Sequence, residues 1–122
     1  MSAPAHKHLK VKNVDGVAIV DFVNSSLMFE SALIDELGDE LQSLLTDHHF
    51  TRILLDFKHV QYLSSTMLGQ LAKLSKDVKA AGGQLKLTGL GPVLLDTFRI
   101  SHFDSLFSIY DDEASALKAF HA

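Results

Sequence analysis

The sequence predicts a single α/β domain built on a mixed, mostly parallel central sheet, with the element order ββαβαβαβα and about four helices. Short apolar segments typical of strands alternate with longer segments in which apolar residues recur at helical spacing. Gly and Pro residues mark the boundaries between these segments. A chain of 122 residues fits one domain, and no repeat or linker composition divides it. We expect one domain over residues 1–122, in which residues 1–8 form a flexible N-terminal segment.

The first two elements form a predicted β-hairpin. Residues 8–14 alternate well enough for a strand, and residues 17–22 supply an apolar return strand. The dipeptide Asp15-Gly16 between them is typical of a tight hairpin turn. Residues 24–26 then have the polar composition of a loop.

A helix and a buried strand are predicted next. One apolar stripe with spacings of three, four and seven residues indicates the helix and consists of Leu33, Ile34, Leu37, Leu41, Leu44 and Leu45. Residues 51–57 follow with four apolar side chains and no alternation. Strands that are covered on both faces have this pattern, so we expect residues 51–57 to lie at the centre of a parallel sheet.

The second half of the chain repeats the alternation of helix and strand. A helix from Met67 or Leu68 to Ala81 ends at a Gly-Gly pair, and residues 84–88 follow as a strand. Pro92 can occupy the first turn of a short helix. Residues 107–110 form a last brief strand, and three acids begin a final helix that ends near residue 120.

Composition excludes several classes of function. The chain has no Cys, which removes disulfides, thiol nucleophiles and Cys-based zinc sites. Its net charge is −4 and its basic residues are dispersed, so we expect no contact with nucleic acid. No apolar run approaches the length of a membrane span, and we expect a cytoplasmic protein without membrane insertion.

Catalytic, metal and cofactor motifs are missing as well. The histidines stand in no known ligand spacing, the glycines match neither nucleotide fingerprint, and the nucleophile pattern Gly-x-Ser-x-Gly is absent. We therefore expect no metal, no cofactor and no catalytic residue in this chain. Phe98, Phe103 and Phe107 could line a pocket, but aromatic residues near the end of an α/β chain are more often part of the core.

Three consecutive hydroxyls, Ser64, Ser65 and Thr66, stand where a strand gives way to a helix. Such a junction presents side chains beside the free N–H groups of the helix, where a phosphate is accommodated electrostatically. Serine is also a preferred N-cap residue, so Ser64 or Ser65 can simply cap the helix. The two interpretations are compatible.

The element order and the segment from Ile53 to Gly69 resemble the STAS domain, the family of anti-sigma factor antagonists. That family has an apolar strand, an Asp, a valine-like residue, then Asp-Ser-Ser/Thr-Gly-Leu opening a helix, and later a Gly-Gly turn. The positions that match this pattern are Asp56, Val60, Ser65, Thr66, Leu68, Gly82 and Gly83. The resemblance covers about residues 9–121. Ser64 replaces the acid before the central serine, and Met67 replaces the glycine after it.

The resemblance implies a regulatory protein of bacterial signal transduction. Ser65 falls on the serine that partner kinases phosphorylate, with Thr66 as the next hydroxyl. The expected partner is an anti-sigma factor with serine/threonine kinase activity, and a serine phosphatase is a further expected partner. Binding would release a sigma factor and regulate transcription, and the protein would be a monomer or a weak homodimer. The partner-binding surface is expected to contain Asn24, Ser25, Ser26, Ser64, Met67 and Gln70.

An alternative from another class is also open. Some similar domains are accessory or scaffold subunits, of a lipid-transport ATPase or of a stressosome-like complex, without phosphoregulation. The same helix face would then bind its partner permanently. Large particles or co-purification with an ATPase would distinguish this alternative.

Overall fold

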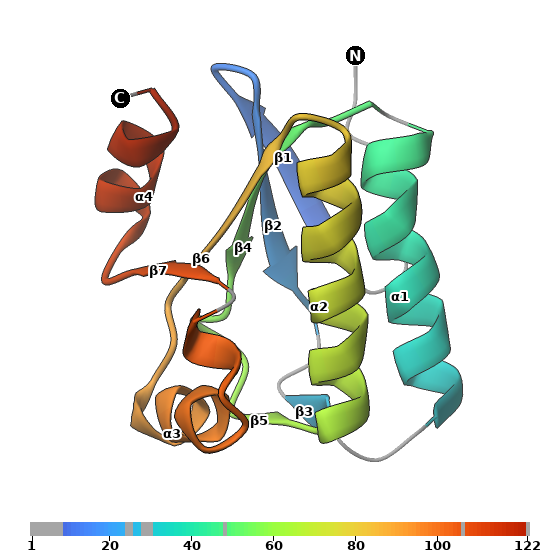
Figure 1. Ribbon diagram of the computed structural model, residues 1–122, viewed down its shortest axis with the longest axis vertical. Coiled ribbons are helices and arrows are strands. Elements are labelled where there is room, and N and C mark those ends of the chain that lie inside the picture. Colours follow the sequence, from blue (N-terminus) through green and yellow to red (C-terminus); the bar gives the residue numbers. More distant parts are fainter. Residues whose placement is uncertain (1–8, 24–25, 28–30, 48, 106, 122) are drawn as a thin grey trace.

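A five-stranded mixed sheet forms the centre of the computed structural model (Figure 1), which describes residues 9–23, 26–27, 31–47, 49–105 and 107–121. Its strands, in spatial order, are β1 (Leu9–Val14), β2 (Val17–Phe22), β4 (Arg52–Asp56), β6 (Gln84–Thr88) and β7 (Ser108–Tyr110). β1 is antiparallel to β2, and the remaining neighbours are parallel. The predicted mixed, mostly parallel sheet is therefore confirmed. Residues 1–8, expected to be a flexible segment, lie outside the described residues.

The hairpin predicted between β1 and β2 is confirmed. Asp15 and Gly16 both have positive φ angles, 52° and 85°. Two successive positive φ angles give the turn a twist that matches the twist of the paired strands. The side-chain oxygen of Asn13 accepts a hydrogen bond from the Gly16 N–H at 3.0 Å and holds the turn.

A second, two-stranded sheet was not predicted. It pairs β3 (Ser26–Leu27) with β5 (Tyr62–Leu63) in parallel. The expected order ββαβαβαβα is therefore incomplete, because a short strand precedes the first helix and another precedes the second. Two residues are too few to show an alternating pattern in the sequence. These two strands are defined only by their pairing with each other.

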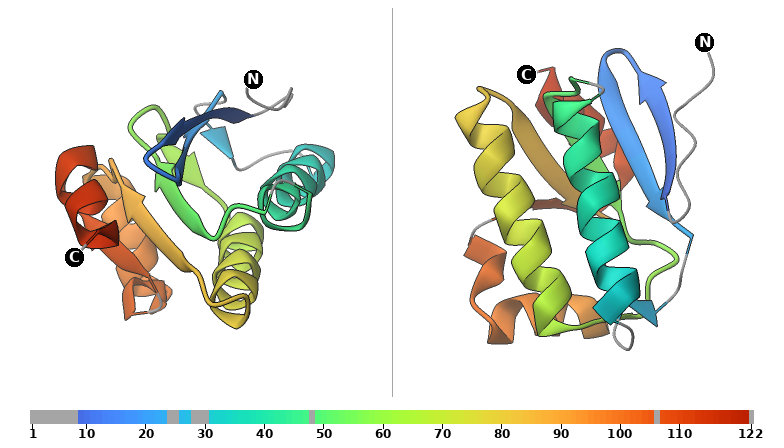
Figure 2. Two further views of the ribbon diagram at one scale, coloured as in Figure 1. Left: turned by 90° about the horizontal axis from the view of Figure 1, so that it is seen from above. Right: turned by 90° about the vertical axis from the view of Figure 1, so that its right-hand side faces the viewer.

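Two long helices, α1 (Ser31–Thr46) and α2 (Ser65–Ala80), pack side by side on one face of the sheet (Figure 2). The short helix α4 (Glu113–Phe120) covers the opposite face. At the end of the sheet where β4 and β6 terminate lie α3 (Pro92–Ile100) and the 3-10 turn η1 (Phe103–Ser105). The four expected helices are all present, although α2 begins at Ser65, two or three residues before the expected start.

Side chains of the sheet alternate between two hydrophobic cores. On β2, Ala18 and Val20 face the large core under α1 and α2, while Val17 and Ile19 face α4. Phe98 and Phe107 belong to the large core, and their rings meet edge to face with centroids 5.7 Å apart. The expectation that Phe98 and Phe107 are core residues is confirmed, and Phe103 is half-buried against the same core. No helix among the described residues is long and apolar enough to cross a membrane.

Candidate functional site

The hydroxyl of Ser64 caps helix α2. Ser64 is in an extended conformation (φ −81°, ψ 161°), and its Oγ accepts a hydrogen bond from the Met67 N–H at 3.1 Å. The cap satisfies one of the backbone donors that every helix leaves free at its N-terminus. Capping, expected for Ser64 or Ser65, is thus confirmed for Ser64. Asp is as good a cap as Ser, so Ser64 can supply the cap that the family's acid would supply.

Ser65 and Thr66 are the first two residues of α2, and both are exposed. Because Ser64 provides the N-terminal cap, the Ser65 hydroxyl is not needed to cap the helix. The N-terminal turn of a helix carries a partial positive charge, so an anionic group attached there is stabilised. The two exposed hydroxyls therefore stand where a phosphoryl group would be tolerated.

Pairing of β3 with β5 brings a distant segment to this junction. Ser26 stands opposite Tyr62 in the register, and Leu27 stands opposite Leu63. Tyr62 and Leu63 lead directly into Ser64, so the loop expected to contact a partner joins the junction through its last residue, Ser26. The other two expected contact residues, at positions 24 and 25, lie outside the described residues.

The expectation that Met67 presents a docking surface is wrong. Its side chain is 0% exposed and belongs to the core with Leu71 and Leu74. Its neighbour Leu68 is buried as well, at 1% exposed. Met67 lies on the buried face of α2 with Leu71 and Leu74, because residues spaced by three, four and seven positions share one face of a helix. A partner could reach this side chain only by disrupting the core.

Gln70, another expected contact residue, is half-buried and faces α1. A Cβ placed on Gly38 of α1 would stand 2.6 Å from the Gln70 Oε1, so the amide lies directly against the glycine backbone. A larger residue at position 38 would displace this flexible amide. A role for Gln70 in partner binding stays a prediction.

Three charged residues meet where β2 and β4 end. Asp21 and Asp56 are neighbours in the parallel register, and the Lys58 ammonium lies 3.7 Å from Asp21 Oδ1 and 3.4 Å from Asp56 Oδ2. The Lys58 N–H also donates to Asp56 Oδ1 at 3.0 Å. The Asp21 carboxylate, and after it the Asp56 carboxylate, raise the pKa of Lys58 above its ordinary value of 10.5. Apart from Asp56, sequence analysis missed this group, although an acid closing each apolar strand was a usable signal.

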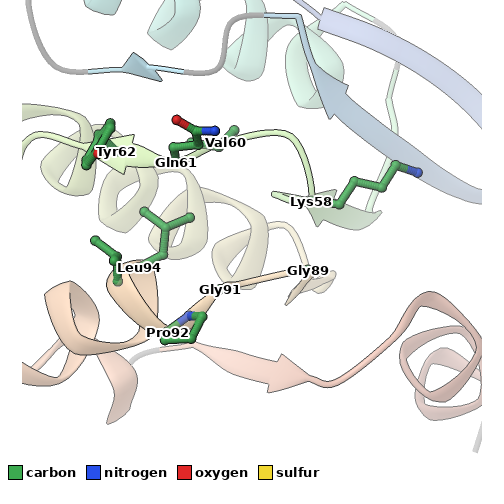
Figure 3. A pocket seen from close by; sticks show the side chains of 9 residues that line it. Lys58, Val60, Gln61, Tyr62, Gly89, Gly91, Pro92 and Leu94 are labelled. Carbon is green, nitrogen blue, oxygen red and sulfur yellow. The ribbon is translucent and has the colours of Figure 1, made fainter.

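A cleft opens beside these charges between two loops (Figure 3). One wall follows the chain from Lys58 to Tyr62 and the other follows it from Gly89 to Leu94, enclosing about 460 Å³. Gly89 has a φ angle of 77°, and a Cβ there would stand 2.5 Å from Asp56 Oδ1 and 2.7 Å from the Lys58 nitrogen. Only glycine therefore allows the two loops to approach this closely.

A second hollow of about 400 Å³ shares Lys58 and Gly89 with the cleft and continues to the start of α4. There Asp112 caps α4, accepting a hydrogen bond from the Ser115 N–H at 2.7 Å. This backbone hydrogen bond lowers the pKa of Asp112 below its ordinary value of 3.8. Sequence analysis assigned the acids to the helix start but did not predict that they face the end of β4.

Within the described part of the chain, no group of three His, Cys, Asp or Glu side chains is placed to hold a metal ion. His59 and His102 are exposed. The carboxylate of Asp56 is engaged by Lys58.

Comparison with known proteins gives consistent results. The family model described as the STAS domain matches residues 8–116. The curated protein BtrV of Bordetella bronchiseptica, named as an anti-sigma factor antagonist, is 29% identical over 112 residues, which is 92% of this chain and 93% of BtrV.

Two solved structures show the same fold. One, described as an anti-sigma factor antagonist from Thermotoga maritima, has a TM-score of 0.81 at 18% identity and covers 93% of this chain and 95% of its own. The other is SpoIIAA, described as a Bacillus cell fate determinant in its phosphorylated form. It has a TM-score of 0.67 at 13% identity and covers 91% of this chain and 97% of its own.

Proposed function

Because this chain belongs to the STAS domain family, we propose that it is an anti-sigma factor antagonist that is switched by phosphorylation of Ser65. In its unmodified form the protein binds an anti-sigma factor, which then releases its sigma factor. Phosphorylation reverses the binding. The name of the Bordetella relative supports the role, and the neighbouring structure of phosphorylated SpoIIAA supports this kind of switch.

One observation carries the assignment of Ser65. Its side chain is exposed at the first position of α2, while the hydroxyl that caps the N-terminus of the helix belongs to Ser64. A kinase can therefore reach the Ser65 Oγ without taking away the cap. Thr66 offers the second exposed hydroxyl, and we assign it the role of a secondary acceptor.

The modifying reaction needs ATP, which the partner kinase supplies. A bond forms between the Ser65 Oγ and the γ-phosphorus, the bond from that phosphorus to the ADP leaving group breaks, and the hydroxyl proton is lost. The product carries about −1.5 to −2 charges at neutral pH. The N-terminus of α2 tolerates this charge, but an acidic or apolar partner surface does not. A serine phosphatase would restore the hydroxyl by hydrolysis.

The proposed contact surface surrounds Ser65. It comprises the exposed residues Ser65 and Thr66 and the loop at residues 24–26, which β3 joins to the junction through Ser26. Met67 lies outside this surface, because its side chain is buried. The role places the protein in the cytoplasm, where sigma factors act.

Binding to the native anti-sigma factor tests the switch. We expect Ser65→Ala to lose most of the ATP-dependent release, and Ser65→Ala combined with Thr66→Ala to bind constitutively even in the presence of ATP. Ser65→Asp should bind much more weakly than wild type. Thr66→Ala is the matched control, because it removes the neighbouring exposed hydroxyl and should leave the ATP-dependent loss of binding in place. Undiminished binding by Ser65→Asp would refute the switch.

Intact mass measurement of protein purified from its native host gives an independent test. Phosphorylation adds about 80 Da per phosphoryl group, which should disappear after phosphatase treatment and map to Ser65. If the mass never changes under any growth condition, a constitutive scaffold would be the better assignment. Co-purification with a transporter ATPase or a large particle would then be expected.

A further inference from the structure

Two exposed apolar side chains line the cleft between the two loops. Among the described residues, the exposed large apolar side chains are Val23, Tyr62, Val93 and Ile100. Tyr62 and Val93 are 49% and 57% exposed, and both line the cleft between the two loops. Exposing two large apolar residues around a concave site is typical of a surface that a partner covers.

The cleft is preformed. Its walls include the buried side chains of Val60 and Leu94, and the backbone N–H of Lys58, which also lines it, donates a hydrogen bond to Asp56. Gly89 lies so close to this hydrogen bond that a Cβ there would stand 2.5 Å from Asp56 Oδ1, so the two loops approach each other closely. A ligand entering a preformed site loses little binding energy to ordering of the protein.

Charge determines which partner fits. The adjoining hollow is lined by four carboxylates, those of Asp56, Asp111, Asp112 and Glu113, against the single ammonium of Lys58. Lys58 is already paired with Asp56 and with Asp21 outside the hollow. The hollow therefore has an excess of negative charge next to an apolar cleft, which favours a cationic group beside an apolar one.

We propose that the cleft and the hollow together bind an extended segment of a partner protein in which an apolar side chain is flanked by Arg or Lys. The apolar side chain packs between Tyr62 and Val93, and the cation reaches Asp111 at the rim of the hollow. Tyr62 is three residues from Ser65, so the partner that Ser65 regulates can contact both places. In this respect the inference extends the proposed function.

Other occupants fit less well. A second copy of this chain carries a net charge of −4 and would bring like charge toward the hollow. Nucleic acid and acidic peptides are repelled for the same reason. Ile100 is exposed on the same helix as Val93 but does not line the cleft, which makes it a matched control.

Nuclear magnetic resonance with the full chain, labelled with nitrogen-15, tests the proposal without any knowledge of the partner. The probe is a capped peptide, Gly-Arg-Ser-Leu-Ser-Arg-Gly, which has Arg on both sides of Leu because the cleft does not dictate chain direction. Two further peptides replace both Arg by Glu, or Leu by Ala. We expect saturable shifts of the amides of Tyr62, Gly89 and Val93 with the first peptide, and much weaker binding of the other two.

Variants locate the binding. An exposed ion pair contributes up to a factor of about five in affinity. Asp111→Lys should therefore weaken binding of the Arg peptide by up to about fivefold. Asp39→Lys, on the exposed face of α1, should change it less than about twofold, the range expected of distant surface charges. Val93→Asp should abolish saturable binding, and Ile100→Asp should leave it intact.

Three outcomes would overturn the proposal: equal shifts with the Glu peptide, absence of localised shifts with every peptide, or equal effects of Val93→Asp and Ile100→Asp. The Ser65 variants report on the proposed function separately. Peptide binding that persists in Ser65→Asp, with loss of anti-sigma factor binding, would support both proposals. If no peptide binds but the Ser65 variants still change binding to the anti-sigma factor as expected, only the proposal about the cleft would be refuted.

Discussion

Replacing Gly89 by alanine should destabilise the protein far more than the same change at Gly82. Both glycines have nearly the same positive φ angle, 77° and 78°. A side chain in this conformation costs about 1–2 kcal/mol, and about 0.4–1 kcal/mol returns because the unfolded chain becomes stiffer. Nothing lies within 4 Å of a Cβ at Gly82, so Gly82→Ala should lose at most about 1.5 kcal/mol of unfolding free energy.

Gly89→Ala has an additional cost. The added Cβ would stand 2.5 Å from Asp56 Oδ1 and 2.7 Å from the backbone nitrogen of Lys58. Relieving these contacts would break the hydrogen bond between that N–H and the Asp56 carboxylate. A hydrogen bond to a charged group contributes about 1.5–3 kcal/mol, so we expect Gly89→Ala to lose about 1.5–3 kcal/mol more than Gly82→Ala. Urea unfolding followed by circular dichroism measures both variants. Equal losses would refute the argument that close approach of the two loops requires this glycine.

Three further predictions concern the helix termini and the core. Met67→Ala should cost about 2–5 kcal/mol of unfolding free energy, as expected of a fully buried methionine, whereas Thr66→Ala, at an exposed position, should cost at most about 0.5 kcal/mol in the same chemical unfolding. Ser64→Ala should cost about 0.5–2 kcal/mol and Ser64→Asp much less, because Asp restores the cap; equal losses would show that the hydroxyl is not the cap. The depressed pKa of Asp112 means that its contribution to stability is present above its ordinary pKa of 3.8 and is lost as the pH falls through the lower folded value. The melting temperature of Asp112→Asn should therefore lie below that of wild type at pH 6 and converge with it under strongly acidic conditions; a constant difference at every pH would contradict the ionic cap.

Elements with a strong local sequence signal could be predicted from the sequence alone. The leucine stripe of α1 and the turn at Asp15-Gly16 each combine many local signals that agree with the final fold. Residues 84–88 were predicted as a strand with the bounds that β6 has in the structure. Element type was therefore predictable wherever local preference and burial point the same way.

Features that depend on pairing could not be found in this way. β3 and β5 contain two residues each, and their structure comes from each other. The convergence of Asp21 with Lys58 likewise follows from the parallel register of β2 and β4, which no local pattern encodes. Met67 is different, because its spacing to Leu71 and Leu74 already placed it on the apolar stripe of α2.

The division of labour between Ser64 and Ser65 has a consequence for cellular turnover. Because the Ser64 oxygen caps the helix and the neighbouring Ser65 is exposed, the proposed phosphoryl group would leave the cap in place. Its charge at the helix N-terminus would raise the free energy of unfolding by about 0.3–1 kcal/mol. Proteases that recognise unfolded chains would then degrade the phosphorylated form no faster than the unmodified one, so under the proposed switch modification would not lower the amount of the protein.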